Sequence, residues 1–218
     1  MTVSRAIHTV KLSRQTAWAW YVVAGALVTL MYVMVPPVAG NGRVMNALGL
    51  SSSVAIVLGI VFHQPKLRKA WIAFLIGQLL FFMGDVYTYS PNVGFPSWGD
   101  ALYLAVYPAL MAGLVMLVRR RNPVSDWASL IDSLILTLGI GLLSWVFLVA
   151  PYIDFSGMAP LDKGISMAYP LGDVLLLAAA IRLAVDAGRR RPAFYLLASS
   201  IVCLLVTDSV YNLSLIHI

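Results

Sequence analysis

The sequence contains no glutamate and little charge of either sign. All nine acidic residues are aspartate, and charged residues make up 11% of the 218 positions, against about 25% in an average soluble domain. The single cysteine, Cys203, excludes an internal disulfide, and no cysteine–histidine spacing fits a zinc site. These shortages argue against soluble globular, disordered, disulfide-scaffold and zinc-finger proteins, and they exclude chemistry that needs a glutamate.

Apolar runs are what the sequence has in abundance. Hydrophobic residues make up 61% of the chain. A run of about 20 apolar residues forms a helix that crosses the roughly 30 Å hydrocarbon core of a bilayer. We therefore predict an all-α, polytopic integral membrane bundle of seven transmembrane helices. The predicted spans are 17–35, 44–62, 70–87, 100–118, 129–150, 164–185 and the segment from 193 onward.

The basic residues predict how this bundle is oriented. Lysine and arginine are retained on the cytoplasmic side of short loops. Of the 15 basic residues, all but Arg43 and Lys163 fall on one side of the predicted spans. We expect residues 1–16 to be cytoplasmic and the loops around 36–43, 88–99 and 151–163 to face outward. The net charge of +6 then reflects membrane topology, and we expect no nucleic-acid partner.

Five aspartates fall inside the predicted spans. An aspartate at the bilayer centre costs about 2.5–3.5 kcal/mol on insertion scales, so it needs a partner, water or a function. Helical rise places Asp85, Asp173 and Asp208 at one height in the outer half, with Asp100 at the outer surface and Asp132 near the cytoplasmic face. Two interpretations stay open: the carboxyl groups fix helix packing, or they form a small-ligand or ion site.

Several tyrosines accompany these aspartates. Asp100, Tyr103 and Tyr107 lie on one helix face, because their spacing is i, i+3 and i+7. A tyrosine hydroxyl can donate to a carboxylate, but tyrosine also favours the membrane interface, where we place Tyr152. The candidate sensing or ligand-binding residues are Asp85, Tyr87, Asp100, Tyr103, Tyr107, Tyr169, Asp173, Asp208 and Tyr211.

Prolines and glycines inside the spans predict bends and close contacts. Pro108 should kink its helix, whereas Pro170 suits either a kink or the first turn of its helix. Gly139 and Gly141 should permit close helix packing. No phosphate-binding glycine loop and no intramembrane histidine pair is present, so we expect no cofactor and no metal.

Short motifs are spread over residues 70–212. They are Gly84-Asp85, Pro96-Ser97-Trp98-Gly99-Asp100-Ala101-Leu102-Tyr103, Tyr107-Pro108, Gly113-Leu114, Arg119-Arg120-Arg121, Asp132-Ser133-Leu134-Ile135, Trp145, Ala168-Tyr169-Pro170-Leu171-Gly172-Asp173 and Asp208-Ser209-Val210-Tyr211. Together they resemble the multi-span N-terminal sensor region of bacterial, often actinobacterial, diguanylate cyclases, which precedes cytoplasmic GGDEF and often EAL domains. The resemblance implies a sensory input module of a cyclic-di-GMP signalling protein in the bacterial plasma (inner) membrane. No GGDEF or EAL motif is present in the sequence, so we expect this chain itself not to be an enzyme.

Two further patterns concern the extent of the domain. Residues 79–87 resemble residues 203–211, which predicts a four-plus-four repeat of helices. The last six residues, 213–218, resemble the translation of a sequencing adapter. We therefore expect a transmembrane domain over 17–212, an artificial tail, and a parent protein that continues into output domains and forms a homodimer through them. The alternative function is an ion-coupled transporter or small-molecule permease, in which the aspartates bind protons or cations.

Overall fold

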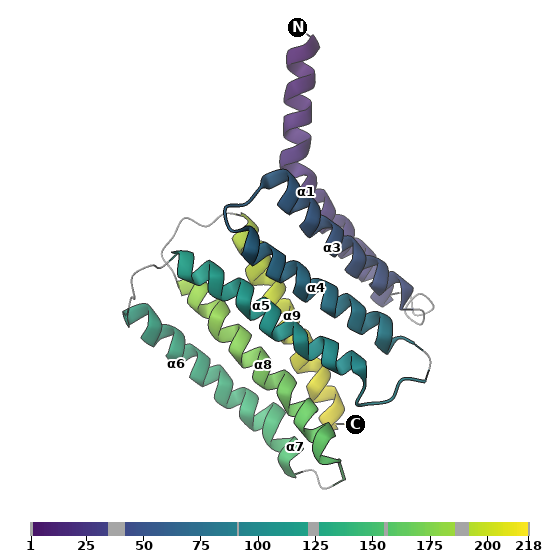
Figure 1. Cartoon of the computed structure of the whole chain (residues 1–218), viewed down its shortest axis with the longest axis vertical. Coiled ribbons are helices and arrows are strands. Elements are labelled where there is room, and N and C mark those ends of the chain that lie inside the picture. The colour runs from purple at the N-terminus through teal and green to yellow at the C-terminus, as the bar shows by residue number, and fades with distance from the viewer. Residues whose placement is uncertain are drawn as a thin grey trace. The chain divides into compact units, whose positions relative to one another are not determined.

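The computed structural model describes residues 2–34, 42–90, 92–121, 127–154, 157–185 and 192–217, and most of them are helical (Figure 1). No β-strand occurs within these ranges. In them, seven helices are long and apolar enough to cross a membrane. The predicted all-α membrane fold is confirmed, and the chain is a multi-pass membrane protein that contacts the lipid bilayer.

The helices agree with the predicted spans to within a few residues at most ends. The elements are α1 (Thr2–Met34), α3 (Arg43–His63), α4 (Arg68–Thr88), α5 (Trp98–Arg121), α6 (Trp127–Ser144), the π-helix η1 (Trp145–Val149), α7 (Ala150–Asp154), α8 (Pro160–Val185) and α9 (Pro192–His217). The segments α6, η1 and α7 follow one another without a break and provide the fifth span, Ile131–Ile153.

The chain divides into two compact units, Met1–Leu48 and Gly49–Ile218. The first unit contains α1 and the beginning of α3, and α1 exposes large apolar side chains such as those of Trp20 and Leu27. The second unit contains the rest of the bundle and every predicted site residue. The functional description therefore concerns the second unit alone.

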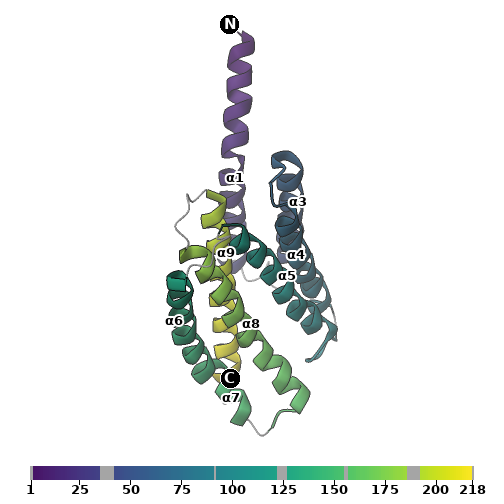
Figure 2. The same cartoon turned by 60° about the vertical axis from the view of Figure 1, so that its left-hand side comes forward.

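Helix α8 is central to the packing of the second unit. It contacts α5, α6 and α9, and α5 in turn packs along α4 (Figures 1 and 2). The apolar core consists of Phe74, Leu114, Leu176, Leu183 and Ile201. Most of these residues lie toward the helix ends next to the basic residues around positions 66–69 and 119–121, which leaves the other end of the bundle for polar groups.

Proline has two different roles in these helices. Pro160 and Pro192 occupy the first position of α8 and α9, where the missing N–H is not needed. Pro108 and Pro170 lie inside helices, and Pro170 is fully buried ten residues after the start of α8. The structure thus places Pro170 in the interior of its helix and not in the first turn.

The packing prediction for Gly139 is wrong, and Tyr152 is more buried than its expected place at the membrane interface requires. The interface position of Tyr152 stays a prediction, but its side chain is only 6% exposed, and its hydroxyl is 3.5 Å from Oδ1 of Asn212 in α9. Its segment follows η1 and packs against α8, which draws it inward. Gly139 has no neighbouring atom within 4 Å of the position a side chain would take, whereas Gly141 faces Val174 at 3.3 Å, as close packing requires.

Some predictions fall at the edge of the described residues. Most of the outward loop around 36–43, residues 155 and 156 of the loop around 151–163, residues 122–126 and the arginines 189–191 lie outside them. Helix α9 continues through the expected adapter-derived tail as far as His217, and Ile218 lies outside the described residues. The origin of the tail and the four-plus-four repeat stay predictions.

Candidate functional site

The first half of α5 presents two tyrosines, one helical turn apart, to different neighbouring helices. The Tyr103 hydroxyl donates to Oδ1 of Asp85 in α4 at 2.7 Å. The ring of Phe81 packs edge-on against the Tyr103 ring, with centroids 5.3 Å apart. This contact explains how a carboxyl group near the end of α4 is accommodated within a helical bundle.

Tyr107 lies between two carboxyl groups from two other helices. Its hydroxyl is 2.9 Å from Oδ1 of Asp173 in α8 and 3.3 Å from Oδ2 of Asp208 in α9. A tyrosine hydroxyl carries a single hydrogen, so it cannot donate fully to both acceptors at once. Tyr107 therefore joins three helices at one point, and its two acceptors compete for one hydrogen.

Asp100 combines a structural role with a third tyrosine contact. It occupies the third position of α5, and its Oδ2 accepts hydrogen bonds from the backbone N–H of Ser97 at 2.8 Å and from the Ser97 hydroxyl at 3.0 Å. The Ser97 Oγ in turn accepts from the N–H of Gly99 at 3.1 Å, which makes Ser97 the N-cap of α5. The other oxygen, Oδ1, accepts from the Tyr169 hydroxyl of α8 at 3.0 Å.

Glycines next to two of the aspartates make room for the tyrosine rings. A side chain at Gly84 would place its Cβ 2.6 Å from the Tyr103 ring, and one at Gly172 would place it 2.6 Å from the Tyr107 ring. In each case the tyrosine lies against the glycine of a Gly-Asp pair and donates to the aspartate of the same pair. The repeated Gly-Asp dipeptide is the sequence signal for these contacts; it was noted among the motifs of the resemblance, but the contacts were not inferred from it.

These contacts form what we call the tyrosine–aspartate network. Its members are Asp85, Asp100, Tyr103, Tyr107, Tyr169, Asp173 and Asp208. The rings of Tyr107 and Tyr169 pack edge-on at 6.4 Å. Seven of the nine candidate residues thus take part in tyrosine–aspartate contacts across α4, α5, α8 and α9.

The two remaining candidates lie outside the network. Tyr87 is 38% exposed and Tyr211 is 63% exposed. Tyr87 follows Asp85 by two residues, a rotation of about 200° around a helix, so the two side chains leave the helix on opposite faces. Closeness in the sequence to Asp85 and Asp208 therefore does not bring Tyr87 or Tyr211 into the network, and both side chains are exposed.

The predicted common height of three aspartates holds for two of them. Asp173 and Asp208 flank the same hydroxyl of Tyr107. Asp85 pairs with Tyr103, about 6 Å further along α5 at helical rise. Asp132 is exposed on α6 and takes no part in the network, in line with its expected separate position.

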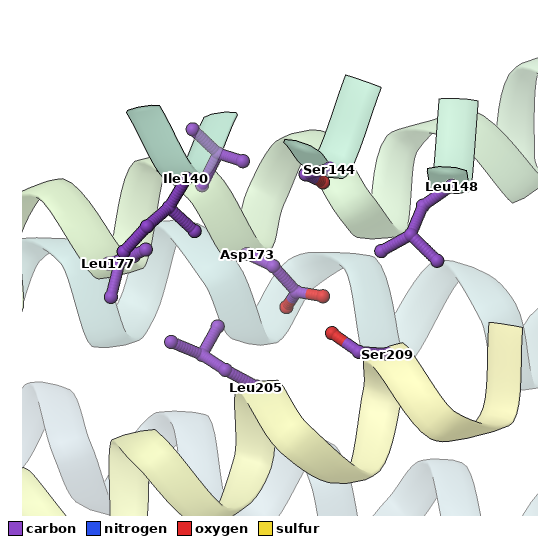
Figure 3. A pocket seen from close by; sticks show the side chains of 8 residues that line it. Ile140, Ser144, Leu148, Asp173, Leu177, Leu205 and Ser209 are labelled. Atoms are coloured by element: carbon purple, nitrogen blue, oxygen red, sulfur yellow. The ribbon is translucent and has the colours of Figure 1, made fainter. Parts of the chain in front are cut away.

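Asp173 also borders a small cavity. The residue is only 6% exposed, and its Oδ2 has no hydrogen-bond partner among the described residues. The cavity has a volume of about 60 Å³, and Figure 3 shows the Asp173 carboxylate directed toward Ser209, with Ser144 on another wall. Its lining comprises Ile140, Ser144, Leu148, Asp173, Val174, Leu177, Leu205 and Ser209. A buried polar atom without a partner is rare, and it marks this cavity as the part of the site that requires an explanation.

Ser144 and Ser209 are the residues that sequence reasoning missed. Serine is unremarkable within a membrane helix, and only the packing of α6 and α9 on α8 brings these two to Asp173. Ser144 directly precedes η1, and Leu148 lies within it. The π-helix has no sequence signature that could have revealed this wall of the cavity.

Comparisons with family models, with curated proteins and with solved structures found no match to this chain.

Proposed function

We propose that the chain is the membrane-embedded sensory module of a bacterial cyclic-di-GMP signalling protein. The support is the coincidence of two independent features. The motifs that resemble diguanylate cyclase sensor regions contain the aspartates and tyrosines of the network, and one hydroxyl, that of Tyr107, contacts carboxyl groups on both α8 and α9. In this proposal the N-terminus is cytoplasmic, the network lies in the outer half of the plasma membrane, and the parent protein continues into output domains through which it forms a dimer.

The contact at Tyr107 supplies a physical means of signalling. Two acceptors on different helices compete for one hydrogen, so a change in charge at either carboxyl group shifts the preferred arrangement. Switches of this kind work when a local change in charge biases a pair of discrete packing states. A signal at the network would then alter the relative positions of α5, α8 and α9.

An ion-coupled transporter or permease is the second candidate function. One observation favours it: Oδ2 of Asp173 is buried without a partner beside a cavity. Intramembrane carboxyl groups mark ion and proton pathways in transporters as well as sensor sites. A measurement of proton or cation flux across the membrane of proteoliposomes that contain the purified chain distinguishes this candidate from a sensor, since only a transporter carries the ion across.

The test of the sensory function uses asparagine substitutions in a complete parent protein. Asp85→Asn, Asp173→Asn and Asp208→Asn remove the charge and preserve side-chain size. We expect each to change the cellular cyclic-di-GMP level severalfold per folded molecule, because each alters a charge within the network. Asp132→Asn, exposed on α6, is the matched control and should leave the level unchanged.

Unchanged signalling in all three variants, at normal protein levels in the membrane, would reject the sensory site. A loss of protein without a change in output per molecule would instead assign the aspartates to helix packing.

A further inference from the structure

We propose that the cavity beside Asp173 binds a small monovalent cation, for which sodium is the probe. Oδ2 of Asp173 is its charged ligand, and the hydroxyl oxygens of Ser144 and Ser209 are its neutral ligands. The inference deepens the proposed function by naming the class of ligand that the sensor detects. Its test measures binding alone, so it succeeds or fails independently of signalling.

The first argument is the unsatisfied charge. Oδ1 of Asp173 accepts from Tyr107 and the side chain also lies within hydrogen-bonding distance of Asp208, whereas Oδ2 has no partner and the residue is more than nine-tenths buried. Within the described ranges, no lysine, arginine or histidine pairs with Asp173 or Asp208. Two adjacent buried carboxyl groups cannot both be ionised without compensation, and a cation in contact with Asp173 supplies that compensation.

The second argument is the shape and chemistry of the cavity. About 60 Å³ accommodates a small ion with a few water molecules. The polar side chains on its wall offer only oxygen atoms, the ligands that hard cations prefer. A single carboxylate faces the cavity, and the described residues contain no group of three His, Cys, Asp or Glu side chains that would suit a divalent metal. These features favour a monovalent ion.

The third argument is the backbone at the cavity wall. The backbone N–H of Ala150 bonds to the carbonyl of Trp145, five residues earlier, which defines the π-helix next to Ser144. Such π-turns are rare overall, and those that occur are often found at functional sites. The remaining walls come from α8 and α9, so a bound cation would contact three separate segments and stabilise them against one another.

The test measures thermal unfolding of the purified full chain in detergent micelles. Sodium chloride is varied against choline chloride at constant total chloride. We expect the melting temperature to rise with sodium and to saturate, because a ligand that binds only the folded state stabilises it. Asp173→Asn should abolish this response, and Asp132→Asn, the matched control, should retain it.

Ser209→Ala provides a second variant that does not depend on the folding of Asp173→Asn. Removing one neutral ligand should raise the half-saturating sodium concentration about tenfold, the equivalent of one lost hydrogen-bond-like contact. An unchanged sodium response in Ser209→Ala, or an equal response in folded Asp173→Asn, would overturn the proposal. Equal stabilisation by choline would also overturn it, because a quaternary ammonium ion cannot be coordinated by oxygen ligands.

Discussion

Tyr107 is the residue on which the polar half of the bundle depends most. Three tyrosine hydroxyls serve four carboxyl groups in the network, and Tyr107 is the one that is shared. Buried carboxyl groups that lose a donor bear a desolvation cost. Loss of the Tyr107 hydroxyl therefore removes the donor of carboxyl groups on two helices, α8 and α9. Loss of the Tyr103 hydroxyl removes the donor of one carboxyl group, on α4.

Substitution of these tyrosines by phenylalanine tests that difference. We expect Tyr107→Phe and Tyr103→Phe each to lower the free energy of unfolding by about 1–3 kcal/mol, with the larger loss for Tyr107→Phe. Urea or thermal unfolding of the purified protein in mild detergent measures the change. Tyr195→Phe, at an exposed tyrosine of α9, is the control and should change stability little. Wild-type stability in Tyr107→Phe would show that its hydroxyl contributes nothing to the bundle.

Sequence patterns predicted which residues are polar in the membrane but not how they pair. The spacing of Asp100, Tyr103 and Tyr107 correctly indicated one face of a helix, yet each of the two tyrosines donates to a different helix and neither donates to Asp100. Helical periodicity predicts only in which direction a side chain points around the axis of its own helix. The partner across the gap depends on how neighbouring helices pack, and no local pattern contains that information.

At the scale of the element, glycines set how closely the helices approach. Gly84 and Gly172 lie against tyrosine rings, and a methyl group there would overlap them. We expect Gly84→Ala and Gly172→Ala each to destabilise the protein by about 1–3 kcal/mol through overpacking. The melting temperature of each purified variant provides the measurement.

Gly139→Ala is the matched control for these substitutions. No atom lies within 4 Å of the added methyl group, and alanine is a better helix former than glycine by up to about 1 kcal/mol. This variant should therefore be as stable as the wild type or slightly more stable. A loss of stability as large as that of Gly172→Ala would contradict the assignment of the glycine contacts.

The helices themselves were largely predictable, and their irregularities were not. Long apolar runs bounded by basic or proline-containing segments indicate membrane helices by composition alone, which is why the seven predicted spans agree with the structure. The N-cap at Ser97 was also readable, since its residues are local. The π-helix and the burial of Tyr152 arise from contacts with α8 and α9, so they lay beyond the sequence pattern.

At the scale of the whole molecule, the asymmetry of charge predicts the membrane topology. Single cysteines in a Cys203→Ser background, at Lys66, Asn92, Arg120 and Asp154 in turn, can be labelled with a membrane-impermeant reagent in intact cells. We expect labelling at Asn92 and Asp154 without permeabilisation, and at Lys66 and Arg120 only after it, because the basic residues favour the cytoplasm. Cytoplasmic Asn92 would overturn the entire orientation.

The π-helix also bears on how the fifth span can vary in length. A segment with i→i+5 hydrogen bonds contains one residue more than the α-helix it replaces. If one residue of Trp145–Val149 were deleted, the segment could form the i→i+4 hydrogen bonds of an α-helix. Helices α6 and α7 would then keep the same faces toward their neighbours. The same deletion early in α8 would rotate Asp173 by about 100° away from Tyr107. Homologous sequences should therefore differ in length at η1 while α8 stays constant, and an alignment that forces a gap elsewhere in these spans would misalign the aspartates.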